Sequence, residues 1–403
     1  ANSRDCCLAL RMGRRVRAGL AGRARMFAPQ APGDRDLLAC RRPYLVCNLT
    51  DATKVKVDGQ GEAISLFTGA GGLDYGFEAA GFRTTTAVEM DAQCCETIRA
   101  NRPDWALVER DIHDAPTAEI LERSSLRPGE VDVVIGGPPC QPFSKSGYWR
   151  GDSLRLGDPR ASTLSAFMRV VLEAEPRAFL LENVAGMAFK GKSEGLSLLL
   201  NCVREVNDRT GASYRPVFKV LRAADYGVPQ VRDRFFLVAA RDGTEFRFPA
   251  PTHISEYRTA WDALGDLEDD SAESLQPRGK WAGLLPSIPE GHNYLWHTDR
   301  GGGMPLFGWR RRYWSFLLKL AKDRPSWTIQ AQPGPAIGPF HWKNRRLSAR
   351  ELCRLQTFPD DVEVRGSLSA VQRQLGNAVP SLLAEVLARE IGLAIMGSVQ
   401  KSA

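Results

Sequence analysis

Cys140 stands at the head of a loop that the sequence makes stiff. The apolar, β-branched run at residues 131–135 predicts a buried strand, and Gly136-Gly137-Pro138-Pro139 ends that strand abruptly. The prolines fix the backbone angle φ on the approach to Cys140, and Pro142 restricts the residue before it. A thiol on a stiff backbone is suited to act as a nucleophile, whereas a lone cysteine beside a turn is more often a buried free thiol. The rest of the chain must decide between these two interpretations.

Carboxylates follow several of the predicted strands. Glu89 and Asp91 end the run that begins at residue 84, Asp111 follows residues 106–108, and Glu182 follows residues 178–181. In an open α/β sheet the carboxyl ends of parallel strands meet at one edge, where ligands bind. A single acid there is more often a helix cap or a surface charge, but acids on successive strand ends favour a binding site. Glu89 is placed to accept hydrogen bonds from ribose hydroxyls, and Asp111 to hold an adenine amino group.

A glycine-rich turn precedes these acids. The apolar run 63–67 is followed by Thr68-Gly69-Ala70-Gly71-Gly72-Leu73-Asp74 and then by a helical stretch that Gly81 ends. A strand, a glycine turn and a helix are how a nucleotide-binding βαβ unit begins. A dinucleotide fingerprint requires glycine where Asp74 stands. Because the Asp74 carboxylate would repel a pyrophosphate and attract a cation, we expect a positively charged cofactor and disfavour a nicotinamide-dependent oxidoreductase.

The second half of the chain carries basic and aromatic residues. Gln230, Arg232 and Arg234 alternate ahead of the apolar run 235–238, so we expect their side chains to point to one side of an extended segment. The alternation of strands and helices stops near residue 242, and basic residues then interleave with aromatic ones at residues 309–314 and 341–346. This pattern predicts a loop-rich region that contacts nucleic acid, although the aromatic residues would also suit a small core of its own.

We therefore expect four parts in the chain. Residues 1–61 are rich in Arg, Gly and Ala and form a flexible extension, residues 62–241 form a catalytic domain, residues 242–345 form the loop-rich domain, and residues 346–403 return to the catalytic domain. The last part begins with a helix in which Ser348 and Glu351 make a capping box. It closes with an apolar helix that follows Pro380.

The composition narrows the class of protein. The 403-residue chain has a net charge of +7, and arginine outnumbers lysine, which favours a polyanionic partner. Nine cysteines without a Cys-x-x-Cys pair or a Cys/His ligand spacing predict reduced thiols in a cytoplasmic protein, and neither a disulfide framework nor a metal site. No apolar run has the length of a membrane span.

Five sequence motifs, taken in their order along the chain, resemble those of the C5-cytosine-specific DNA methyltransferases of bacterial restriction-modification systems. The likeness extends from residue 63 to the C-terminus, with a variable region in the gap where the family has one. It rests on Phe67-Thr68-Gly69-Ala70-Gly71-Gly72, Gly137-Pro138-Pro139-Cys140-Gln141, Glu182-Asn183-Val184, Gln230-Val231-Arg232-Asp233-Arg234 and Gly376-Asn377-Ala378-Val379.

The resemblance implies a mostly parallel, Rossmann-like α/β sheet that binds S-adenosylmethionine, with the loop-rich region as a smaller target recognition domain. Cys140 would add to C6 of cytosine, because C5 is a poor nucleophile until electron density is pushed onto it. Glu182 would donate to N3, Arg234 would hold O2, and Arg232 would brace the catalytic loop together with Gln230. S-Adenosylmethionine, and the product S-adenosylhomocysteine, would bind without a metal against Phe67, Gly69, Gly71, Gly72, Glu89, Met90, Asp111, Ile112, Pro138, Leu164, Asn377 and Val379.

The resemblance also implies a substrate and a setting. Because the target carbon lies inside the duplex, the cytosine must be flipped out into the pocket that holds Cys140. The implied protein is a monomer at the nucleoid of a bacterial cytoplasm, which acts on double-stranded DNA and shares its site with a cognate restriction endonuclease without binding it stably. The recognition sequence stays open. A cytosine methyltransferase of transfer RNA would carry the same motifs without a sizeable variable region, and a binding-only relative would lack Cys140 or Glu182.

Overall fold

The computed structural model describes residues 61–139, 162–189, 194–267 and 275–396. The chain divides into two compact units, residues 1–54 and residues 55–403, and every described residue belongs to the second. The expected N-terminal extension up to residue 60, Cys140 and the loop that follows it therefore lie outside the described residues.

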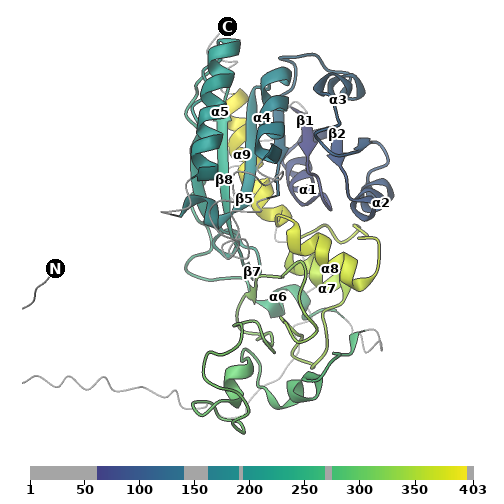
Figure 1. Ribbon diagram of the computed structural model, residues 1–403, viewed down its shortest axis with the longest axis vertical. Coiled ribbons are helices and arrows are strands. Elements are labelled where there is room, and N and C mark those ends of the chain that lie inside the picture. Colours follow the sequence, from purple (N-terminus) through teal and green to yellow (C-terminus); the bar gives the residue numbers. More distant parts are fainter. Residues whose placement is uncertain (1–60, 140–161, 190–193, 268–274, 397–403) are drawn as a thin grey trace, which may run out of the picture. The chain divides into compact units, whose positions relative to one another are not determined.

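A seven-stranded sheet is the main element of the described chain (Figure 1). It is built from β1 (Gly61–Leu66), β2 (Phe82–Glu89), β3 (Ala106–Glu109), β4 (Val133–Gly136), β5 (Ala178–Val184), β6 (Val217–Arg222) and β8 (Asp233–Ala240). The strands lie in the order β3-β2-β1-β4-β5-β8-β6. All neighbours pair in parallel except β8, which is antiparallel to both β5 and β6. The mostly parallel α/β sheet is thus confirmed.

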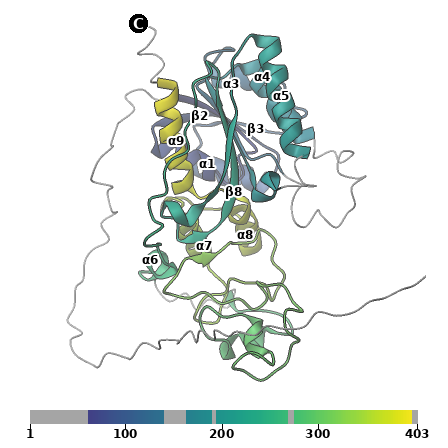
Figure 2. The same ribbon diagram turned by 90° about the vertical axis from the view of Figure 1, so that its left-hand side faces the viewer.

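Helices cover both faces of this sheet, as Figures 1 and 2 show. They are α1 (Gly72–Ala79), α2 (Ala92–Asn101), α3 (Thr117–Ser124), α4 (Ser162–Ala174), α5 (Glu194–Thr210) and α9 (Ser381–Met396). Alternate residues of β4 face the two sides: Val134 packs into a cluster with α3, α4 and α5, whereas Val133 and Ile135 pack into a cluster with α1 and α9. A strand buried on both faces is apolar throughout, which explains why residues 131–135 gave a clear signal.

Helix α4 packs beside the carboxyl end of β4 through the expected apolar stripe. Leu164, Phe167, Met168 and Val171 are all buried, and each contributes about 1.5–3 kcal/mol through burial. A side chain at Gly136 would approach the Phe167 ring to 3.1 Å, so glycine allows the helix to lie close to the end of the strand.

The described residues between β8 and residue 349 contain little regular structure. They include α6 (Ala260–Leu264) and β9 (Ser326–Trp327), and β9 pairs in parallel with β7 (Gln230–Val231). A small separate core in this region is formed by Leu285, Ile288, Tyr294, Phe316, Leu317 and Phe340. Some of its aromatic residues are therefore core residues, whereas Tyr313, Trp314 and Trp327 remain exposed. The division into domains stays a prediction.

Three helices close the described chain: α7 (Ala349–Leu355), α8 (Leu368–Asn377) and α9. The capping box of Ser348 and Glu351 is present at the start of α7, as predicted. Leu383, Leu387 and Ile391 of α9 pack against the same sheet face as α1, so the last helix returns to the first strands. None of the described helices is long and apolar enough to cross a membrane.

Candidate active site

Glu182 and Arg234 form a buried ion pair at the carboxyl end of β5. Strand β8 runs antiparallel to β5, and this register brings Arg234 opposite Val184. The Nε atom of Arg234 donates to Oε1 of Glu182 at 2.9 Å, and the two side chains expose only 14% and 10% of their surface. Burial raises the pKa of Glu182 even though the charge of Arg234 opposes that rise. The pair therefore combines a carboxyl that accepts a proton readily with a fixed cation.

The loop that leads to Cys140 begins against this carboxyl. A side chain at Gly137 would lie 2.8 Å from Oε2 of Glu182, so glycine lets the backbone pass close to this carboxyl without displacing it. The next residue, Pro138, accepts a hydrogen bond at 3.2 Å through its carbonyl oxygen from Nδ2 of Asn183. Two sequence motifs, one after β4 and one at the end of β5, are thereby joined. Cys140 itself lies outside the described residues.

The side chain of Arg232 has no exposed surface and contacts main-chain carbonyls. Its Nη1 donates to the carbonyl oxygen of Ile329 at 3.2 Å and its Nη2 to that of Gly376 at 2.6 Å. Burial, and then the charge of Arg234, lower its pKa well below the ordinary arginine value. Gln230, also fully buried, accepts from the backbone N–H of Ile329 at 3.1 Å. Gln230 and Arg232 therefore fix the segment after β9, whereas Arg234 alone reaches Glu182.

Glu89 holds the glycine turn in place. Its Oε2 accepts from the backbone N–H of Gly69 at 2.7 Å, and its Oε1 accepts from those of Met90 and Asp91 at 2.9 and 2.8 Å. Burial raises its pKa against the effect of these hydrogen bonds. Two carboxylate oxygens offer about four acceptor positions, so one position is left for a ligand hydroxyl. The acid and the glycines, predicted separately, lie in one site.

The glycine turn also meets the C-terminal motif. A side chain at Gly72 would lie 2.3 Å from the carbonyl oxygen of Val379 and 3.2 Å from Cβ of Ala378. Gly69 and Gly71 adopt positive φ angles of 60° and 83°, which glycine adopts without strain. The segment that contains Asn377 and Val379 therefore lies directly on the turn.

The other residues expected at the cofactor differ in exposure. Met90 and Asn377 are exposed, Phe67 and Asp111 are half-buried, and Pro138, Ile112, Leu164 and Val379 are buried. Asp111 acts as a local cap: its Oδ1 accepts from the backbone N–H of His113 at 2.9 Å and lies 2.6 Å from the imidazole Nδ1. The backbone hydrogen bond is the main cause that lowers the pKa of Asp111, so this carboxyl carries a negative charge.

The expectation for Asp74 is wrong. Its side chain is fully buried under α1, where Oδ1 accepts a hydrogen bond from Oγ1 of Thr84 at 3.1 Å. A residue without exposed surface cannot touch a ligand at the glycine turn. Burial instead raises the pKa of Asp74 to about 7. Glu89, by contrast, contacts the turn directly through the hydrogen bond from Gly69.

Two residues that the sequence did not single out join distant parts of the site. Gln356 is fully buried and accepts from Nε2 of Gln230 at 3.1 Å, and its own Nε2 donates to the carbonyl oxygen of Leu375. Arg373 of α8 donates to both carboxylate oxygens of Asp91, at 2.6 and 3.1 Å. Gln356 could have been suspected because it is a polar residue that follows Leu352 and Leu355 at the end of α7. Nothing in the sequence around Arg373 indicated its contact.

Comparisons with known proteins agree with this geometry. Residues 61–393 match the family model of the C-5 cytosine-specific DNA methylases. Type II methyltransferase M.SacI of Streptomyces achromogenes is 42% identical over 363 residues, which cover 81% of this chain and 92% of that protein. Type II methyltransferase M1.HphI of Haemophilus parahaemolyticus is 35% identical over 340 residues, covering 81% of this chain and 86% of that protein.

A solved structure shares the fold. It is a DNA modification methyltransferase encoded within a prophage of Escherichia coli, which is 24% identical, superposes with a TM-score of 0.62, and covers 84% of this chain and 100% of its own. The family model spans most of the chain, and the curated relatives match it over most of their own length. The chain therefore belongs to the C-5 cytosine-specific DNA methylase family and is a DNA cytosine-5-methyltransferase.

Proposed function

We propose that this protein methylates C5 of a cytosine flipped out of a specific duplex DNA sequence, through a covalent bond between Cys140 and C6. The observation that carries the proposal is the buried pair of Glu182 and Arg234, against which the loop leading to Cys140 begins. The curated relatives are named as type II methyltransferases, which favours duplex DNA over transfer RNA as the substrate.

The chemistry begins with the thiolate. An ordinary cysteine thiol with a pKa of about 8.5 is only a few per cent ionised at neutral pH, so a neighbouring cation or the substrate itself must favour the charged form. The Cys140 sulfur forms a bond to C6, and the electron pair of the C5–C6 double bond moves toward C5 and N3. Methylation at C5, loss of the C5 proton and departure of the thiolate then restore the aromatic ring. A nucleophile of this kind divides one difficult step into easier ones.

Glu182 and Arg234 suit the opposite edge of the base. A carboxyl whose pKa is raised by burial can share a proton with N3 as negative charge develops in the ring. The Arg234 guanidinium, 2.9 Å from that carboxyl, provides donors for the adjacent O2. Arg232 touches main-chain carbonyls and not the base, so its part is to hold the segment that carries Arg234.

The residues at the strand ends fit S-adenosylmethionine. A Cβ atom at Gly69 would meet nothing nearer than the carbonyl oxygen of Phe67 at 4.0 Å, so a ligand can approach the backbone of the glycine turn there. Glu89 keeps one acceptor position for a ribose hydroxyl. The ionised Asp111 and the acidic surroundings tolerate a positive charge, and the exposed Met90 offers an apolar surface for an adenine ring. When bound, S-adenosylmethionine supplies the methyl group as an electrophile. Phe67, Gly71, Gly72, Ile112, Pro138, Leu164, Asn377 and Val379 complete the proposed binding set.

An exposed basic and aromatic surface is proposed to contact the DNA. Arg310, Arg311 and Arg312 are exposed and precede Tyr313 and Trp314 in the sequence. The Trp314 ring packs edge-on against Trp327 at 5.8 Å, and Trp327 pairs with Val231, three residues before Arg234. Through Trp327, this surface therefore contacts the strand β7, which precedes Arg234 of the proposed catalytic pair. Arginines of this region suit guanine edges in the major groove, and aromatic rings suit bases.

The biological role follows from the reaction. We expect a monomer that acts on the nucleoid in a bacterial cytoplasm and protects sites that a cognate restriction endonuclease would cut, without a stable complex between the two enzymes. Bisulfite sequencing of DNA from cells that express the chain tests the reaction and identifies the sequence. Methylated cytosines confined to one short motif are expected, and an unmethylated genome alongside methylated transfer RNA would move the substrate to RNA.

The covalent step has a separate test. A duplex with 5-fluorocytosine at the target has no C5 proton to lose after methylation. In the presence of S-adenosylmethionine, the wild-type protein should therefore remain attached to it and migrate as a stable adduct in denaturing electrophoresis. Cys140→Ser should form none, and Cys202→Ser is the matched control because Cys202 lies on α5 away from the proposed site. An adduct that Cys140→Ser forms at an undiminished rate would remove the mechanism.

A further inference from the structure

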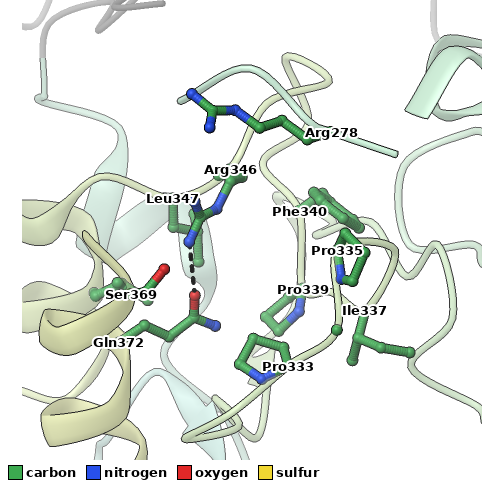
Figure 3. A pocket seen from close by; sticks show the side chains of 12 residues that line it. Arg278, Pro333, Pro335, Ile337, Pro339, Phe340, Arg346, Leu347, Ser369 and Gln372 are labelled. Carbon is green, nitrogen blue, oxygen red and sulfur yellow. Dashed lines mark hydrogen bonds between the residues drawn. The ribbon is translucent and has the colours of Figure 1, made fainter. Parts of the chain in front are cut away.

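A pocket of about 300 Å³ lies beside α8, outside the proposed catalytic and cofactor sites. One wall consists of the side chains that α8 presents, and the facing wall belongs to the chain that follows β9 (Figure 3). Two arginines reach it from different loops. The residues around it are Arg278, Pro333, Gly334, Pro335, Ile337, Pro339, Phe340, Arg346, Leu347, Leu352, Ser369 and Gln372.

The two arginines, Arg278 and Arg346, lack the partners that their neighbours have. Around α7 and α8, Arg345 pairs with Glu351, Arg354 with Asp266 and Arg373 with Asp91. Within the described chain, no carboxylate forms an ion pair with Arg278 or Arg346. Burial, and then the charge of Arg278, lower the pKa of Arg346, so the two cations repel each other. An anion between them would remove that repulsion.

Gln372 and Ser369 are the other polar side chains of the pocket. Nη2 of Arg346 lies 3.4 Å from Oε1 of Gln372, which leaves most of its guanidinium donors available. Ser369 lies in the first turn of α8, the positive end of a ten-residue helix whose N-cap is Ser367. The facing wall of prolines, Ile337 and Phe340 carries no carboxylate that would repel an anion. The pocket is therefore suited to a compact oxyanion with several acceptor oxygens.

We propose that Arg278 and Arg346 bind a phosphate group in this pocket, with the hydroxyl of Ser369 as an additional donor. Guanidinium groups match the paired oxygens of a phosphate, and two of them can contact one phosphate from both sides. The backbone of DNA supplies such phosphate groups, and the assignment of the bound phosphate to DNA rests on the proposed function. A free phosphate compound has the same chemistry and is the other source.

Helix α8 connects the pocket to the proposed active site. Gln372 lines the pocket, and Gly376, four residues later, accepts the hydrogen bond from Arg232. Four residues of helix span about 6 Å. A DNA phosphate held here would lie at a fixed distance from the segment that carries Arg234 and from the Asn377 loop. The contact would thus position the DNA strand, and read none of its sequence.

Salt-dependent binding of the full chain to a short fluorescent duplex of arbitrary sequence tests the DNA source. Losing one phosphate contact makes the plot of log affinity against log salt concentration shallower by about 0.9. We expect this change in Arg346→Gln and in Arg278→Gln, and no larger change in the double variant, because both side chains hold the same phosphate. Arg209→Gln, which removes an exposed arginine at the end of α5, should leave the slope unchanged.

Thermal unfolding tests the other source without DNA. Inorganic phosphate should raise the Tm of the wild-type chain above its value in chloride of equal ionic strength, and Arg346→Gln should lose this rise. Arg346→Glu should lose it too, yet unfold no earlier than the wild type in chloride, because the new carboxylate can pair with Arg278. This variant separates loss of the site from loss of the fold.

The outcomes assign or overturn the site. A shallower slope in the pocket variants identifies a DNA phosphate. An unchanged slope with loss of the phosphate-induced rise in Tm identifies a small phosphate compound. Folded variants that match the wild type in both measurements would overturn the proposal. Neither measurement depends on methyl transfer, so a chain that fails to methylate DNA still gives an interpretable answer.

Discussion

Nε of Arg234 lies 2.9 Å from Oε1 of Glu182, and both side chains are almost fully buried. Removing two charges from water costs several kcal/mol per ion, which their attraction offsets only in part. The ion pair at the end of β5 is therefore not expected to contribute much to the stability of the folded protein. It is better explained as a pair of groups prepared for a ligand that has an acceptor and a site of developing charge side by side.

Glu182→Gln should abolish most of the methylation without unfolding the protein. Glutamine keeps the size of the side chain but cannot give a proton to N3, and a positioned general acid contributes about 10²–10⁴-fold to a rate. Single-turnover methyl transfer to duplex DNA measures the loss. Glu173→Gln on the exposed side of α4 should react at the wild-type rate. A Glu182→Gln protein with undiminished turnover would remove Glu182 from the mechanism.

Glu89→Ala should weaken S-adenosylmethionine binding by about tenfold or more. The change removes the acceptor proposed for the ribose, and it also releases the backbone N–H of Gly69 from its hydrogen bond at 2.7 Å. Isothermal titration calorimetry measures the affinity directly. Glu96→Ala, an exposed acid on the next helix, is the control and should bind normally. Equal affinities for the two variants would refute the ribose assignment.

The sequence predicted the sheet well because its strands are buried on both faces. Residues 133–135 and 178–181 are apolar throughout, and each run is followed by residues that differ from it in character. The α4 stripe was equally readable, since Leu164, Phe167 and Val171 follow the period of a helix with one buried face. In both cases the pattern that determines the structure is local.

The error at Asp74 came from packing that the local sequence does not show. Asp74 lies in α1, and its carboxyl faces the sheet, where it accepts a hydrogen bond from Oγ1 of Thr84 on β2. Glu78 of the same helix is partly exposed, so the helical pattern alone could not show which of the two acids is buried. The contacts of Gln230 and Arg232 with Ile329 were equally unreadable, because they depend on the pairing of β7 with β9, which lies far along the chain.

Gly72→Ala should disrupt the contact between the glycine turn and the C-terminal motif. A Cβ atom there would lie 2.3 Å from the carbonyl oxygen of Val379, a contact that requires the backbone to move. Overpacking of this kind costs about 1–3 kcal/mol. We expect a lower Tm and weaker S-adenosylmethionine binding. Gly283→Ala meets no atom within 4 Å and should leave both unchanged. A Gly72→Ala protein as stable as Gly283→Ala would contradict the close approach.

Asp74 predicts a dependence of stability on pH. Burial raises its pKa from 3.8 to about 7, so the folded state binds the proton more tightly than the unfolded chain does. Its contribution is complete below pH 3.8 and is lost as the pH rises through about 7. At 1.36 kcal/mol per pKa unit, the loss is roughly 4 kcal/mol. Asp74→Asn cannot ionise and should lack this loss. Urea unfolding of both proteins at a series of pH values measures the difference, and parallel curves would exclude the shift.

Tyr313→Ala and Trp314→Ala should weaken DNA binding while the fold stays intact. Tyr313 exposes 82% of its surface and Trp314 53%, so neither residue contributes much to the small core around Phe316. Stacking of a base on an aromatic ring is worth about 1–3 kcal/mol, which corresponds to a loss of affinity of about fivefold or more. Fluorescence anisotropy with a duplex, combined with Tm measurements, tests both halves of the prediction. Ile254→Ala removes a side chain that is 64% exposed elsewhere on the surface and should bind DNA normally. If all three variants bind alike, the exposed rings beside Arg312 are ordinary surface, and the DNA contact must be sought among the arginines alone.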